Sequence, residues 1–169
     1  MAINDVSRII EEIRKCKEKG LSYPALFMGL SIPDVCGKIK YPELAGIRKT
    51  KERYLKWFDE FIDPIHNPID YAFPDSNMKR EFDGKACYEL RCAMLHAAET
   101  DIGKKIDVDK FVIDFLPFAG GILYSENLDY IPEKNSEGVY EWRRKKKIYI
   151  NALALVDIIL EAYEKSIKN

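Results

Sequence analysis

The sequence predicts a mainly helical fold: a bundle of four to five helices with a small β-hairpin insertion, about residues 108–150, before the last helix. Several segments carry apolar residues at helical spacing, whereas after Gly103 short apolar runs are separated by Pro117, Gly120 and Gly121. The second pattern is typical of strands joined by turns. A chain of 169 residues that is 47% hydrophobic can bury one core, so we expect a single domain over residues 1–169.

Three helices are expected in the first third of the chain. Residues 4–19 form an amphipathic segment, and Gly20 follows it as a stop signal. We expect Ser22 to cap a second helix over 23–30 and Pro33 to open a short third one over 33–39. Each boundary follows from a residue that favours a helix end or a helix start.

The next helix is predicted over 46–62, where an apolar stripe faces the core. The basic cluster from Arg48 to Arg53 is interpreted as the hydrated face of this helix. Pro64, Pro68 and Pro74 then favour an irregular loop over 63–82. The predicted stripe consists of Tyr54, Leu55, Phe58, Phe61 and Ile62.

The second half of the chain supplies the remaining elements. Asp83 is a favourable cap for a helix that runs to about Thr100. Residues 111–115, 122–128 and 139–150 are expected to be extended. Asn151 caps the last helix, which is apolar almost all round and should therefore pack centrally.

Composition excludes several classes of protein. The 27 basic and 28 acidic residues give a formal charge of −1, so any nucleic-acid contact must be local. The chain has no basic leader and no apolar run of about 20 residues, which predicts a cytoplasmic protein without a membrane partner. The cysteines form no CxxC pair, so we expect reduced structural thiols, no metal and no cofactor. They are Cys16, Cys36, Cys87 and Cys92.

Only His66 and His96 could serve acid–base catalysis through an imidazole, and the common enzyme signatures are absent. No second candidate catalytic residue lies at a characteristic spacing from His66 in the sequence. Arg91 precedes His96 by five residues, which on a helix is about 7.5 Å of rise and about 140° of rotation, so the two side chains diverge. Two copies of the helix around a two-fold axis would bring both pairs into one cleft. Such a cleft has an acid, a base and fixed positive charge, as RNA cleavage requires.

The string LRCAMLH at residues 90–96 resembles the RxxxxH motif of the HEPN superfamily, which consists of helical bundles. The strings at 25–37 and 53–59 resemble a widespread, largely uncharacterised bacterial family that also carries an LRCAxLH helix. The resemblance implies a metal-independent endoribonuclease that acts as a homodimer in toxin–antitoxin or phage-defence systems, with an antitoxin as a further partner. It implies Arg91 and His96 as catalytic residues. Cys92 stands where active enzymes usually carry Asn, Asp or His.

Neighbouring residues support either a catalytic or a structural role for this helix. Tyr88 shares a helical face with Arg91, and Glu99 lies one turn after His96, where it can orient the imidazole. Alternatively, Arg91 forms an internal ion pair with Glu89 or with a carboxylate on the 46–62 helix. The domain would then be a non-catalytic interaction or nucleotide-sensing module.

A basic run offers a separate candidate site for nucleic acid. The aromatic residues Tyr140, Trp142 and Tyr149 flank it and can stack on bases. The alternative interpretation is a solvated strand. The run consists of Arg143, Arg144, Lys145, Lys146 and Lys147.

Overall fold

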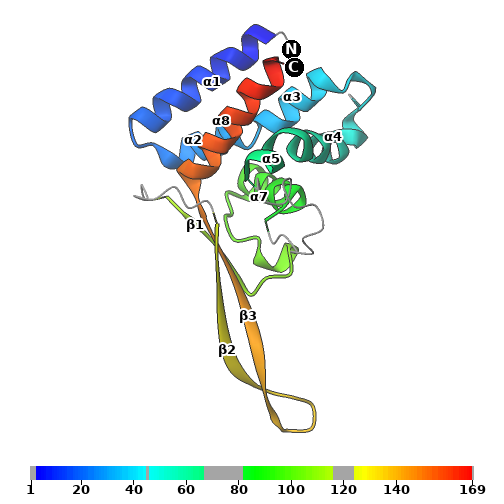
Figure 1. Cartoon of the computed structure of the whole chain (residues 1–169), viewed down its shortest axis with the longest axis vertical. Coiled ribbons are helices and arrows are strands. Elements are labelled where there is room, and N and C mark those ends of the chain that lie inside the picture. The colour runs from blue at the N-terminus through cyan, green and yellow to red at the C-terminus, as the bar shows by residue number, and fades with distance from the viewer. Residues whose placement is uncertain (1–2, 45, 67–81, 116–123, 169) are drawn as a thin grey trace.

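The computed structural model describes residues 3–44, 46–66, 82–115 and 124–168. It confirms a mainly helical fold with a β hairpin before the final helix (Figure 1). The α-helices are α1 (Ile3–Glu18), α2 (Ser22–Gly29), α3 (Ile32–Lys40), α4 (Thr50–Trp57), α5 (Asp63–His66), α7 (Gly84–Ala97) and α8 (Ala152–Lys168). Short 3-10 turns occupy Pro42–Leu44, Ile47–Lys49 and Gly103–Lys105.

The boundaries of the first helices agree with the predicted ones, except for one cap. Gly20 has a φ of +69°, a left-handed conformation that ends α1 at little cost because glycine lacks a Cβ. Ser22 was predicted to cap α2, and that prediction is wrong. The capping position belongs to Leu21, which makes no side-chain hydrogen bond, while Ser22 is the buried first residue of the helix.

A π-helical turn, Phe58–Ile62, joins α4 to α5, so the helical segment continues four residues beyond its predicted end. Pro64 has no N–H to donate to the carbonyl four residues earlier, and a wider turn before it accommodates that missing bond. Phe58, Phe61 and Ile62 all remain buried across the turn. The predicted loop over 63–82 is therefore helical at its start, and its residues 67–81 lie outside the described part of the chain.

Helix α8 is central to the bundle, as its apolar sequence predicted. Leu155, Val156 and Ile159 are fully buried, and the helix packs on α2. Asn151 caps it, because its Oδ1 accepts a hydrogen bond of 2.9 Å from the backbone N–H of Ala154. Within the described residues, none of the helices has both the length and the apolar character that crossing a membrane requires.

The described strands form a three-stranded sheet in the order β1-β3-β2. Strand β1 (Lys110–Asp114) is parallel to β3 (Tyr140–Asn151), and β2 (Tyr124–Lys134) is antiparallel to it. Because β1 pairs only with residues 147–151 of β3, residues 128–134 and 140–146 form a two-stranded arm. Figure 1 shows this arm projecting away from the bundle, so the predicted insertion is longer than a compact hairpin.

Candidate functional site

Helix α7 carries the predicted catalytic pair, and both of its ends are defined. Asp83 caps it as predicted, because its carboxylate accepts a hydrogen bond of 2.8 Å from the backbone N–H of Ala86. The helix ends at Ala97, three residues before the predicted end, since Ala98 adopts a left-handed conformation with a φ of 54°. Arg91 therefore lies in the middle of α7 and His96 in its last turn.

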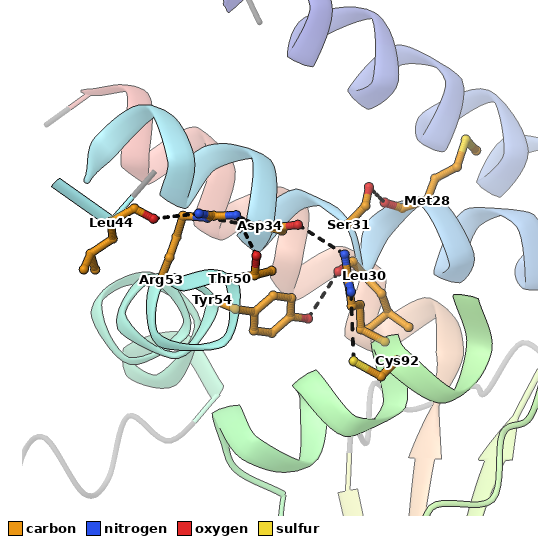
Figure 2. A network of polar contacts seen from close by, with 10 residues as sticks. Met28, Leu30, Ser31, Asp34, Leu44, Thr50, Arg53, Tyr54 and Cys92 are labelled. Atoms are coloured by element: carbon orange, nitrogen blue, oxygen red, sulfur yellow. Dashed lines mark hydrogen bonds and ion pairs between the residues drawn. The ribbon is translucent and has the colours of Figure 1, made fainter. Parts of the chain in front are cut away.

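Arg91 joins α7 to α3 through an ion pair with Asp34. Its Nη2 lies 3.2 Å from Asp34 Oδ2. The other oxygen of the same carboxylate accepts hydrogen bonds from Arg53 of α4, at 3.1 Å from Nε and 2.7 Å from Nη2. In Figure 2 Asp34 lies between Arg53 on one side and the α7 helix on the other. One carboxylate thus links three helices and neutralises only one of two guanidinium charges.

Arg53 is the buried member of this network, with only 5% of its surface exposed. Its Nη1 donates to the Leu44 carbonyl at 2.7 Å, and its Nη2 also donates to Thr50 Oγ1 at 3.3 Å (Figure 2). Gly37 permits this packing, because a Cβ at that position would lie 2.7 Å from Arg53 Cγ. The interpretation of the whole Arg48–Arg53 cluster as hydrated is therefore wrong for Arg53, although Arg48 is exposed.

Arg91 is held less completely than Arg53. Its Cζ lies 5.9 Å from the centre of the Tyr88 ring, and its Nη1 lies 3.9 Å from Cys92 Sγ, a long contact. Its Nε is buried and has no hydrogen-bond partner among the described residues. A buried donor without an acceptor costs about 1–3 kcal/mol, so the guanidinium is positioned mainly by Asp34 and by the aromatic ring.

Aromatic and thiol groups form the layer beneath the network. The Tyr54 and Tyr88 rings meet edge to face with centroids 5.3 Å apart, and the Tyr54 hydroxyl donates to the Leu30 carbonyl at 3.2 Å. Burial, followed by a hydrogen bond with the Cys92 thiol, raises the pKa of Tyr88. Burial also raises the pKa of the Cys87 thiol to about 12, so this group stays neutral. The layer therefore supplies packing and no additional charge.

His96 lies apart from the network. It is exposed in the last turn of α7, and no hydrogen bond or ion pair joins it to Glu99 or to any other described residue. Glu99 is also exposed, and its backbone N–H donates to the Ala93 carbonyl at 3.2 Å. One copy of the chain therefore presents a half-buried, paired arginine and a separate exposed imidazole.

The predicted partners of Arg91 were incorrect. Glu89 pairs instead with Lys51, at 3.2 Å between Oε1 and Nζ, and the carboxylate that pairs with Arg91 comes from α3. Asp34 and Arg53 were not identified as functional candidates. Asp34 lies in the string at 25–37 and Arg53 in the string at 53–59. The occurrence of both strings together with the α7 motif was the signal that could have identified these two residues.

The basic run lies on β3, in the two-stranded arm and at its base. Residues that are directly opposite in the register point to the same side of the ribbon, and here even-numbered residues oppose even-numbered ones, such as Arg144 and Tyr130. The arm therefore has an even face and an odd face. The positions of Arg143, Arg144, Lys145 and Lys146 are known from this register alone, since their side chains lie outside the described part of the structure.

Among the described residues, no three histidine, cysteine or acidic side chains come together as a metal site would require. No family model matches this chain, and no curated protein or solved structure matches it either.

Proposed function

We propose that this chain is a HEPN-like helical module that binds single-stranded RNA through the even face of its β2–β3 arm. The observation that carries the proposal is the exposure of two aromatic side chains at successive even positions, Tyr140 at 67% and Trp142 at 72%. Solvent-exposed aromatic rings beside cations are the elements with which proteins bind single strands, because every base offers a stacking surface.

The two faces of the arm differ in charge. Within the arm, residues 128–134 and 140–146, the even positions of the register hold three basic residues and no acidic one: Lys134, Arg144 and Lys146. The odd positions hold Arg143 and Lys145 together with three acidic residues: Asp129, Glu133 and Glu141. A polyanion is attracted to the even face alone, and this local asymmetry agrees with the nearly neutral charge of the whole chain.

Lys134 and Tyr140 on the even face are close enough to act together. Lys134 Nζ lies 5.8 Å from the centre of the Tyr140 ring, across the strand pair. Pro132 adds flat surface on the same face, by register with Trp142. Phosphates can thus contact the cations while bases stack on the rings.

The test is the fluorescence anisotropy of a labelled uridine-rich RNA titrated with protein. Arg144→Ala/Lys146→Ala should raise the Kd about tenfold or more and reduce its salt dependence, because two phosphate contacts are lost. The matched control, Arg143→Ala/Lys145→Ala, removes the same charge from the odd face and should change the Kd little. Equal weakening by the two double variants, or preferential binding of duplex RNA, would contradict the proposal.

In this proposal Arg91 has an internal role, since it ties α7 to α3. Arg91→Ala leaves Asp34 with one partner instead of two, and we expect the free energy of unfolding to fall by about 1–3 kcal/mol. The Kd for RNA should be unchanged. Unfolding in urea measures the first quantity and the anisotropy titration the second; a variant of normal stability with weakened RNA binding would refute the internal role.

A second candidate function, metal-independent cleavage of RNA by a homodimer, is favoured by the exposed and unpaired imidazole of His96. Across a two-fold contact between α7 helices, two such groups supply the acid and the base, while Arg91 stabilises phosphorane charge. This proposal includes an antitoxin or another protein as a regulator.

Incubation with assorted RNAs separates the two candidates. The nuclease proposal predicts cleavage that His96→Ala abolishes, with a protein that sediments as a dimer. Glu99→Ala is the control, because Glu99 lies one turn from His96 without contacting it. RNA that stays intact, or a strictly monomeric protein, eliminates the nuclease and leaves the binding module.

A further inference from the structure

Strand β3 has an open edge along its outer part. Residues 147–151 lie between β1 and β2, whereas residues 140–146 pair with β2 alone in the described register. Alternate residues of a strand direct their backbone N–H and C=O groups to the same side, so about half of the backbone groups of 140–146 have no partner strand. Figure 1 shows this part of the arm beyond the bundle. The open edge is about 20 Å long, at about 3.3 Å per residue.

Strand β1 cannot extend along this edge. The chain bends at Asp109, directly before the strand, and Asp107 has a left-handed φ of 59°. Val108 is buried, and its backbone N–H donates to the Gly103 carbonyl at 2.9 Å. These contacts hold the segment before β1 in the turn that begins at Gly103. The position beside residues 140–146 is therefore open to a strand from another molecule.

The opposite edge of the arm is closed to such a strand. Strand β2 contains Pro132, which has no N–H to donate, and a proline on an edge strand blocks the addition of a further strand. No proline occurs in the sequence of Tyr140–Asn151. Strand addition is therefore restricted to the β3 side of the arm.

The charge of β3 determines which strand fits this edge. Positions 143–147 are all basic, so both faces of an added strand lie beside basic positions. A second β3 strand would place like charges opposite one another, which is destabilising, whereas opposite charges across two strands contribute about 0.2–1 kcal/mol per pair. An acidic strand is thus favoured over a second copy of this edge.

We propose that residues 140–146 of β3 bind an extended acidic segment of another protein as a third strand of the arm. Main-chain hydrogen bonds along the edge supply affinity, and the basic positions select carboxylates. A two-stranded ribbon is only marginally stable, so the added strand also stabilises the arm. The inference is independent of RNA binding, because it uses the backbone edge of β3 and not the aromatic rings of the even face.

The experiment measures residue-resolved amide hydrogen exchange with an acetylated and amidated heptapeptide, VEEVEEV, in the absence of RNA. At saturating peptide, alternate amides within 140–146 should exchange at least about tenfold more slowly, because each N–H on the open edge gains an acceptor. The amides between them already pair with β2 and should change less. Uniform protection, or none, would overturn the proposal, since an anion bound on a face of the ribbon produces no alternation.

Two matched peptides separate the contribution of the backbone from that of charge. VKKVKKV reverses the charge. VEEVEEV that is N-methylated at its central valine and at the next glutamate keeps the charge but loses a donor on each of its two edges. Each of these peptides should bind at least about tenfold more weakly in calorimetry. Equal affinity of the methylated peptide would show that charge alone holds it and would contradict strand addition.

A pair of double variants tests the basic positions. Arg143→Ala/Lys145→Ala should raise the Kd for VEEVEEV about fivefold, because two cross-strand charge pairs are lost. Arg8→Ala/Lys19→Ala removes the same charge from exposed positions in and next to α1, and should leave the Kd unchanged. The same Kd in both variants would refute the selection of an acidic strand by β3.

Discussion

The network of Asp34, Arg53 and Arg91 between α3, α4 and α7 and the β2–β3 arm contain the same kinds of charged residue. They differ in how far these residues are exposed to solvent and paired with each other. In the network Arg53 is 5% exposed and shares Asp34 with Arg91, so its charge is fixed inside the bundle. In the arm, the consecutive basic positions 143–146 follow Tyr140 and Trp142 along β3, and those two aromatic rings face solvent. The comparison shows that the secondary structure decides whether a basic residue is exposed. A packed helix buries every third or fourth residue, whereas a two-stranded ribbon exposes both of its faces.

The largest expected effect concerns the buried side of this comparison. Arg53→Ala takes the hydrogen bonds of Arg53 away from three buried or half-buried groups, so the free energy of unfolding should fall by about 3–5 kcal/mol. Arg48→Ala, at an exposed position of the same basic cluster, should change it by less than about 0.5 kcal/mol. Denaturant unfolding of both variants checks the difference. Similar changes in the free energy of unfolding for the two variants would contradict the conclusion that Arg53 is buried and paired while Arg48 is hydrated.

A smaller effect is expected from Gly37, which makes room for Arg53. Gly37→Ala would place a Cβ 2.7 Å from Arg53 Cγ and 3.0 Å from the Arg53 carbonyl oxygen. The backbone oxygen cannot move freely, so we expect a loss of about 1–3 kcal/mol. Gly46→Ala is the control, because a Cβ there meets nothing within 4 Å. Thermal unfolding of the two variants should separate them; an unchanged melting temperature for Gly37→Ala would show that α3 and α4 are less tightly packed.

Alkaline pH should weaken the bundle through its buried thiols. Burial raises the pKa of Cys36 and of Cys87 from 9.0 to about 12. Their contribution to stability is complete below pH 9 and is lost as the pH rises from 9 towards 12, because only the unfolded thiols ionise. Each should cost about 1 kcal/mol per pH unit in that interval. Urea unfolding at pH 8 and 10 tests this, and Cys36→Ala/Cys87→Ala should flatten the dependence; an unaltered slope would exclude the thiols as its cause.

The smallest effect on stability is expected in the arm. Trp142 is 72% exposed, so Trp142→Ala should change the free energy of unfolding by less than about 0.5 kcal/mol. The same variant should weaken RNA binding by about 1–3 kcal/mol, since one stacking surface is lost. Urea unfolding measures the change in stability and RNA titration measures the change in affinity, so the two experiments together test whether Trp142 acts in binding rather than in packing. A large loss of stability would mean that the arm packs on another surface.

Much of the fold could be predicted because its signals are local. Gly20, Asp83 and Asn151 each mark a helix boundary through backbone conformation or capping, and the structure confirms all three. The π turn could not be predicted, since its residues satisfy an ordinary helical pattern and only Pro64 suggests a break. The length of the arm also exceeded the prediction, because β2 continues to Lys134, six residues beyond its predicted end, and Asp129, Pro132 and Glu133 in that stretch disfavour a strand.

The candidate site was predicted only in part. Its placement on α7 follows from spacing within one helix, but the partner of Arg91 does not. Asp34 lies 57 residues away in the chain, and such a contact is set by how α3 and α7 pack. Arg53 appeared hydrated because its neighbours are charged, and its burial depends on the space that Gly37 leaves.

No loop separates β3 from α8: the strand ends at Asn151 and the helix begins at Ala152. With Asn151 buried and bonded to the first turn, there is no residue between them that can absorb a rotation. A twist applied to the arm by a bound strand is therefore transmitted along a stiff rod about 25 Å long. At the far end of that rod Tyr163 and Ile167 line a pocket between α1, α3, α4 and α8, so tension on the arm would alter the shape of that pocket.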